Sequence, residues 1–162
     1  MTLTAAVTHD RVGDDELQVA VLIAAAAAGD RVARFRLMAV VQPAVLRYCR
    51  ARLGTGDAAA EVARRVCRTV LATLADLPDS AAKVRAFVHG IAADLVDAVP
   101  VPAGLPGMAG MLTVLSPAQR EVLVLRVAVG LSAEDTASTI GSTPGAVRHI
   151  QHHALERLRS AG

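Results

Sequence analysis

The feature that most restricts the fold is the C-terminal stretch GLSAEDTASTIGSTPGAVRHIQHHALERLR, in which two helix-start signals follow each other. Serine and threonine hydroxyls accept hydrogen bonds from unpaired amides at helix starts, and proline is tolerated in the first helical turn. The pattern predicts a short helix over residues 132–140, a turn at Gly141 and a longer helix over residues 143–159. These are the proportions of a helix-turn-helix motif, whose second helix enters the DNA major groove.

Specific residues predict each of the two helix starts. Ser132 is followed three residues later by Asp135, which approximates a capping box. Ser142 or Thr143 is expected to cap the second helix, and Pro144 stands in its first turn. Proline lacks the amide that would otherwise be left without a partner there, so both starts are consistent with helix.

The second predicted helix has one apolar stripe and one polar face. The apolar positions recur at three- and four-residue steps and are expected to pack inward: they are Val147, Ile150, Ala154 and Leu158. The side chains that project elsewhere are polar: they are Arg148, His149, Gln151, His152 and His153. Arginine bonds guanine and glutamine bonds adenine in a bidentate way, and histidine can donate to a base or a phosphate.

The polar face therefore predicts DNA contact. Amides near the start of such a helix meet phosphate, and its first side chains meet base edges. The predicted DNA-binding residues are Ser142, Thr143, Arg148, His149, Gln151, His152, His153 and Arg157. Two other interpretations stay open: a solvated face, or a zinc site shared by His149 and His153. No metal site is predicted, because Glu156 is the only further ligand nearby and the HExxH pattern is absent.

The rest of the chain also has helical periodicity with polar starts, and no strand is predicted. Helices are expected over residues 14–28, 30–53, 57–77 and 80–99, and again from residue 117. Asp30, Asp57 and Ser80 are the expected N-caps. Pro43 lies inside the second helix, where it predicts a kink or a break. The valine-rich segment 121–129 is expected to be helix, because it continues from the start SPAQRE.

Residues 100–110, PVPAGLPGMAG, are rich in proline and glycine and carry no charge, which is typical of a linker. The predicted fold is all-α, with two small helical domains joined by this linker. We expect a flexible N-terminus over residues 1–13, one helical domain over 14–99 and a helix-turn-helix domain over 111–162.

Charge and cysteine usage narrow the class of protein. The chain has 17 Lys and Arg against 15 Asp and Glu, and this formal charge of +2 permits nucleic-acid binding without requiring it. Cys49 and Cys67 lie among apolar helical positions and are expected to be buried, reduced thiols. The apolar run 19–28 is about half the length of a bilayer span and follows acidic residues. We therefore expect a cytoplasmic protein without a membrane partner.

The stretch LSPAQREVLVLRVAVGLSAEDTASTIGSTPGAVRHIQHHALERLR resembles region 4 of bacterial extracytoplasmic-function (ECF) sigma factors, in particular the actinobacterial sigma-D-like group. The segments VLRYCRARLGTGDAAAEVARRVCRTVLATL and VRAFVHGIAADLVDA resemble region 2 of the family. The resemblance covers about residues 17–160. It implies that region 4 reads the promoter −35 element, and that region 2 binds RNA polymerase core and helps to recognise and open the −10 element.

The same resemblance implies the partners. They are the beta and beta-prime subunits of RNA polymerase core, promoter double-stranded DNA and, as a further candidate, an anti-sigma factor. No cofactor is expected.

Region 2 departs from the family where the resemblance places the polymerase contact. The family pattern there is an acidic face, D-D-L/V-x-Q-E, that meets the polymerase clamp helices. The corresponding residues 60–65 keep one acid, Glu61, and have Arg64 and Arg65 in place of a polar-acidic pair. The residues predicted to bind core polymerase are Glu61, Arg64, Arg65 and Arg68. Like charges brought together at an interface cost several kcal/mol, so weaker docking is expected. The helix end 94–99 also has no basic residue to neutralise DNA phosphates.

These patterns leave three functions to compare. We favour an ECF sigma factor that binds core polymerase and directs promoter-specific initiation. The alternatives are a divergent sigma-like regulator or polymerase accessory with impaired core binding or promoter melting, and a helical interaction module held by an anti-sigma partner. An enzyme is not expected, because the chain has no paired carboxylates, nucleophile with its base, or phosphate-binding glycine loop.

Overall fold

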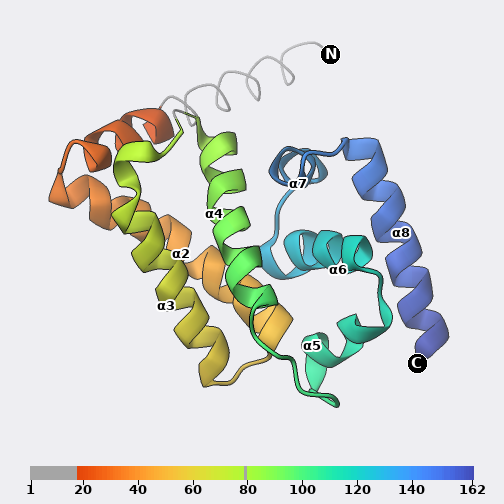
Figure 1. Ribbon diagram of the computed structural model, residues 1–162. Helices are drawn as coiled ribbons and strands as arrows, with labels where there is room; N and C mark the ends of the chain where they lie inside the picture. Colours follow the sequence, from red (N-terminus) through yellow and green to blue (C-terminus); the bar gives the residue numbers. More distant parts are fainter. Residues whose placement is uncertain (1–17, 79) are drawn as a thin grey trace, which may run out of the picture.

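The computed structural model describes residues 18–78 and 80–162, whose regular elements are all helical (Figure 1). Residues 18–27 form the first described helix. The elements that follow are α2 (Arg31–Leu53), α3 (Asp57–Ala72), η1 (Leu74–Asp76), α4 (Ala81–Asp97), α5 (Gly107–Met111), η2 (Leu112–Val114), α6 (Pro117–Leu123), η3 (Val124–Val129), α7 (Ala133–Ile140) and α8 (Pro144–Ala161). The all-α prediction is confirmed, since the described ranges contain no strand. The predicted flexible N-terminus and the expected start of the first helix lie outside the described residues.

Most of the predicted caps begin their helices. The Asp30 carboxylate accepts a hydrogen bond from an amide in the first turn of α2 at 2.9 Å, and the Ser80 hydroxyl accepts one in α4 at 3.3 Å. Asp57 is wrong as the predicted cap of α3, because the helix begins at Asp57 itself and Gly56 holds the cap position without a side-chain hydrogen bond. Asp57 stands instead in the first turn, where a carboxylate is stabilised by the helix dipole.

Of the kink or break predicted at Pro43, the break is wrong, because helix α2 runs through this residue without interruption. The neighbouring Val41 and Val45 are 9% and 3% exposed. Burial of these side chains stabilises helix on both sides of the proline, and this outweighs the one backbone hydrogen bond that proline removes. Pro43 itself is exposed to solvent.

Two groups of helices pack into one molecule. In Figure 1, α2, α3 and α4 lie together in an N-terminal half (residues 18–98), and α5 to α8 form a C-terminal half (residues 107–162). Helix α2 packs against α3 and α4 of its own half and against α5 and η3 of the other, while α4 packs against α7. One apolar core therefore crosses the boundary: among its buried residues are Leu37, Val45, Val88, Leu123 and Leu125.

The predicted linker is partly helical. Helix α5 begins at Gly107, inside the segment 100–110, and Ala109 in this helix is 5% exposed. Contact of α5 with α2 provides the apolar surface that orders it. Gly110 is needed at this turn because a Cβ atom there would lie 1.8 Å from the carbonyl oxygen of Leu105.

Both cysteines are free, as predicted, although only one is fully buried. Cys49 is buried and Cys67 is half-buried. Burial, and to a lesser extent the neighbouring Cys67, raises the pKa of the Cys49 thiol to about 11. The thiol of Cys49 is therefore protonated at neutral pH. In the parts of the chain that the structure describes, no helix is long and apolar enough to cross a bilayer.

Candidate nucleic-acid interface

Helices α7 and α8 form the predicted helix-turn-helix. The Ser132 hydroxyl caps α7 by accepting a hydrogen bond from the amide three residues on at 2.9 Å. Gly141 ends α7 with φ of 67°, a left-handed conformation that other residues rarely adopt. Thr143, rather than Ser142, caps α8, because its hydroxyl accepts from the Ala146 amide at 3.2 Å. The turn and both helix starts thus follow from local side-chain chemistry.

The apolar stripe predicted on the second helix is the face that holds α8 in place. Val147 and Ala154 are completely buried, and Ile150 and Leu158 are half-buried. Val147 packs in a cluster with one buried valine of α6 and two buried alanines of α7. The orientation of α8 is therefore fixed by packing, and the same polar face is always turned outward.

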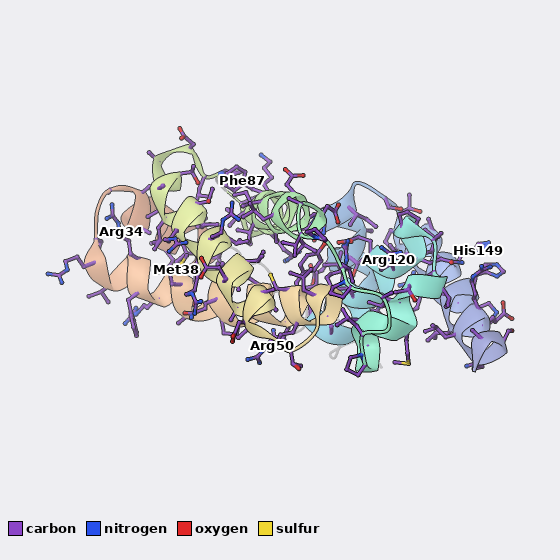
Figure 2. All side chains as sticks on the ribbon, turned by 60° about the horizontal axis from the view of Figure 1, so that its bottom comes forward. Arg34, Met38, Arg50, Phe87, Arg120 and His149 are labelled. Carbon is purple, nitrogen blue, oxygen red and sulfur yellow. The ribbon has the colours of Figure 1, made fainter. Side chains whose placement is uncertain are left out.

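Four predicted DNA-binding side chains lie on the exposed face of α8: they are Arg148, His149, His152 and His153. The rings of His149 and His153 meet edge to face with centroids 4.4 Å apart. His152 and His153 approach Glu156 at 3.3 and 3.1 Å. Figure 2 shows His149 at the outer edge of the molecule, at the opposite end from Arg34. This surface carries the kinds of donor that contact phosphates and base edges.

Arg148 is exposed and paired within the motif. Its guanidinium forms an ion pair with Glu134 in the first turn of α7, and the two side chains are 59% and 62% exposed. A hydrogen bond from its own backbone and then the Arg148 guanidinium hold the pKa of Glu134 below its usual value. Exposed ion pairs contribute little to stability. The Arg148 guanidinium can therefore leave Glu134 and bind a base or a phosphate at a small cost in free energy.

Three predicted residues make contacts inside the protein. The side-chain oxygen of Gln151 accepts a hydrogen bond from Arg126 Nε at 2.9 Å, and Arg157 Nε donates to the carbonyl of Val114 at 2.6 Å. Ser142 is half-buried in the turn. Bidentate readout of adenine by Gln151 requires both ends of its amide, and hence release from Arg126. DNA contact by these three residues stays a prediction.

The four residues predicted to bind polymerase share one exposed face of α3. The carboxylate of Glu61 lies 2.8 Å from Arg64 Nη2 and 3.3 Å from Arg68 Nη2. The hydrogen bond from Arg64 is the largest cause that lowers the pKa of Glu61. Arg65 is also exposed on this helix. Glu61 is thus engaged by two arginines of the same helix, and three of the four predicted residues are basic.

Known proteins resemble the chain over most of its length. Residues 111–160 match the family Sigma-70, region 4. The ECF RNA polymerase sigma factor SigD of Mycobacterium tuberculosis is 39% identical over 171 residues, which cover 85% of this chain and 81% of SigD. The chain belongs to the ECF family of RNA polymerase sigma factors. The ECF RNA polymerase sigma factor ShbA of Streptomyces griseus is 38% identical over 185 residues, covering 91% of this sigma factor and 97% of ShbA.

Two further proteins are similar to this sigma factor. The RNA polymerase sigma-E factor of Streptomyces coelicolor is 47% identical over 49 residues, covering 30% of this chain and 28% of that protein. Among solved structures, the fold is similar to CnrH in its complex with the cytosolic domain of CnrY, with a TM-score of 0.68 and 22% identity over 88% of this chain and 95% of that one.

A charged cluster between the halves of the sigma factor is not predicted by the sequence. Glu121 of α6 accepts hydrogen bonds from Arg52 Nη1 at 2.8 Å and from the Tyr48 hydroxyl at 3.2 Å, and lies 2.5 Å from His89 Nε2. Arg52 also pairs with Asp97 at 2.5 Å. The side chains of Arg52, His89 and Glu121 are only 11%, 16% and 20% exposed. The only signal in the sequence is an acid beside a run of apolar residues, VLVL, which does not identify its partners.

Electrostatics keep the Glu121 carboxylate charged despite its burial. Burial alone would raise its pKa, but the hydrogen bond and charge of His89, the Tyr48 hydroxyl and the Arg52 guanidinium outweigh that effect, so the pKa is lowered. Burial and the adjacent Glu121 raise the pKa of Tyr48, which keeps the phenol a neutral donor. Donors from α2 and α4 thus satisfy one acid from α6.

Proposed function

We propose that α8 is the element with which this sigma factor reads the −35 element of its promoters. The observation that carries the proposal is the exposed face with Arg148, His149, His152 and His153, held in a fixed orientation by the completely buried Val147 and Ala154. The amides at the start of α8 supply phosphate contacts, and the side chains of its first turns meet base edges.

The proposed polymerase contact is the basic face of α3. Its residues lie on one exposed side of a single helix: Glu61, Arg64, Arg65 and Arg68. A face of this polarity still docks on core polymerase where the partner surface offers carboxylates or hydrogen-bond acceptors, and docks weakly where it offers arginines. A divergent sigma-like regulator with impaired core binding is the second candidate, favoured by the engagement of Glu61 by Arg64 and Arg68.

We also propose that an anti-sigma factor binds this protein in the cytoplasm. The structural neighbour CnrH was solved in complex with the cytosolic domain of CnrY, and it shares the fold of this chain over most of its length. The sigma factor is proposed to have no enzymatic activity of its own, because phosphoryl transfer belongs to the core polymerase.

A footprint of the reconstituted holoenzyme on promoter fragments tests the assignment of α8. Arg148→Ala is expected to remove protection of the upstream element, because the substitution deletes a base-reading donor from the first turns of α8. Arg159→Ala is the matched control, since Arg159 is an exposed arginine in the last turn of the same helix. Equal loss of protection with both variants, or unchanged protection with Arg148→Ala, would exclude specific reading by Arg148.

A further inference from the structure

The side of α8 opposite its buried residues carries three histidines and one acid. His149, His152, His153 and Glu156 recur at steps that place them on one face of a helix, and we call them the histidine stripe. The side chains of His152 and His153 are 66% and 52% exposed, and Figure 2 shows His149 at the outer edge of the molecule. On the basis of the function proposed above, we infer that the histidine stripe binds promoter phosphates in its protonated form, so that binding of the −35 element takes up protons.

The three rings of the stripe are close enough for their charges to interact. The ring centroids of His149 and His153 lie 4.4 Å apart, and those of His152 and His153 lie 5.7 Å apart. Like charges at such distances disfavour protonation of neighbouring rings, so full protonation needs negative charge nearby. Glu156 supplies one such charge, at 3.3 Å from His152 Nε2 and 3.1 Å from His153 Nδ1. One carboxylate does not offset three imidazolium charges, whereas the phosphates of DNA supply the remainder.

The other charged groups around α8 have partners of their own. Helix α8 packs against α6, α7 and η2, and it also accepts a hydrogen bond from η3. The charged side chains of these elements are all engaged in other contacts: Arg120, Glu121, Arg126, Glu134 and Asp135. On α8 itself, Arg148 pairs with Glu134, and Arg157 donates to a backbone carbonyl. The charge that this face of α8 presents to DNA therefore depends on protonation of the histidines.

Proton uptake follows from the chemistry of imidazole and phosphate. Histidine changes its charge between about pH 5 and pH 8, and the protonated ring has two N–H donors where the neutral ring has one. A phosphate favours the charged form, and a ligand that prefers the protonated form draws protons onto the protein when it binds. Arginine keeps its charge throughout this range, so it binds phosphate without this dependence on pH. Affinity for the −35 element is therefore expected to rise as the pH falls from 8 to 6.

Equilibrium binding of the reconstituted holoenzyme to a labelled promoter fragment, measured between pH 6 and pH 8, tests the inference. Wild-type holoenzyme is expected to bind about tenfold more tightly at pH 6, because uptake of one proton changes an equilibrium constant by up to about tenfold per pH unit. A triple variant with His149→Gln, His152→Gln and His153→Gln is expected to lose this gain, since glutamine takes up no proton. Glutamine is a good helix former and the three positions are exposed, so circular dichroism is expected to show unchanged helix content.

Arg159→Gln is the matched control for loss of charge from α8. It removes a permanent cation from an exposed position in the last turn of the same helix. Any loss of affinity in this variant is expected to be equal at every pH, because arginine does not titrate in this range. The control holoenzyme is therefore expected to keep the gain of about tenfold at pH 6.

The salt dependence of binding identifies phosphate as the ligand of the stripe. Each phosphate neutralised by a cation on duplex DNA steepens the fall of log affinity with log salt concentration by about 0.9. The slope for wild-type holoenzyme is expected to be steeper at pH 6 than at pH 8 by about 0.9 or more. The triple variant is expected to show the same slope at both pH values.

Parallel pH profiles of wild type and the triple variant would overturn the inference, and so would a wild-type salt slope that is equal at pH 6 and pH 8. Tight binding with parallel profiles would leave the proposed function of α8 standing. Absence of wild-type binding to promoter fragments at every pH would overturn the proposed function together with the inference.

Discussion

Single charged residues of α3 are expected to determine how strongly the sigma factor binds its polymerase. Arg65 is exposed on α3 where the resemblance to region 2 predicts an acid, and Glu61 on the same helix is paired with Arg64. If the predicted contact is with basic residues of core, Arg65→Glu replaces a like charge by an opposite one, and it is expected to strengthen binding to core by about 1 kcal/mol or more. Fluorescence anisotropy of the labelled sigma factor titrated with core measures the change.

Arg65→Gln separates removal of a positive charge from addition of a negative one. The affinity for core is expected to be highest with glutamate at position 65, intermediate with glutamine and lowest with the natural arginine. The reverse order would show that Arg65 makes a productive contact with core, and that this sigma factor docks on a surface of different charge from the one its relatives use.

The Glu121 carboxylate makes stability depend on pH in a defined direction. Its pKa in the folded protein is lowered from the ordinary value of 4.5, so its contribution is fully present above that value and is lost as the pH falls through the folded pKa. The titratable and charged groups that face it are Tyr48 and Arg52 of α2 and His89 of α4, and Asp97 pairs in turn with Arg52.

Urea unfolding of wild type and Glu121→Gln measures this dependence. At neutral pH the free energy of unfolding of Glu121→Gln is expected to be about 1.5–3 kcal/mol lower than that of wild type, which is the usual range for a hydrogen bond to a charged group. The difference is expected to shrink steadily below pH 4.5. A difference that stays constant from neutral to acid pH would mean that the charge of Glu121 does not stabilise the fold.

At the scale of elements, the turn between α7 and α8 depends on one backbone conformation. Gly141 has φ of 67°, so Gly141→Ala is expected to destabilise the protein by about 1–2 kcal/mol. Gly90 is an exposed glycine inside α4 whose Cβ would meet nothing within 4 Å, so Gly90→Ala is expected to stabilise by about 0.8–1 kcal/mol. Thermal unfolding measures the Tm of both variants. An equal shift of Tm in the same direction would show that the left-handed conformation of Gly141 is not required at this turn.

The elements that the sequence predicts well are those set by local chemistry. The predicted hydroxyl caps Ser80 and Ser132 begin α4 and α7 in the structure, and the apolar stripe of α8 packs inward as expected. The uninterrupted helix at Pro43 and the ordering of α5 depend on packing against other elements, which periodicity does not contain. The partners of Glu121 lie 32 to 73 residues away along the chain, so no local pattern identifies them.

At the scale of the whole molecule, one chain combines a firmly packed helix-turn-helix, the proposed polymerase-binding face of α3 and a boundary between its halves with apolar and charged side chains. The helix-turn-helix is held by buried apolar residues, and the boundary contains both a shared apolar core and the charged groups around Glu121. The family assignment requires that this arrangement direct initiation when core polymerase is present.

Run-off transcription with purified core polymerase and genomic promoter fragments tests that central claim most directly. The wild-type protein is expected to give discrete transcripts, Arg159→Ala to give the same transcripts, and Arg148→Ala to lose most of them. An absence of specific transcripts with wild-type protein, from core that is active with another sigma factor, would contradict the account.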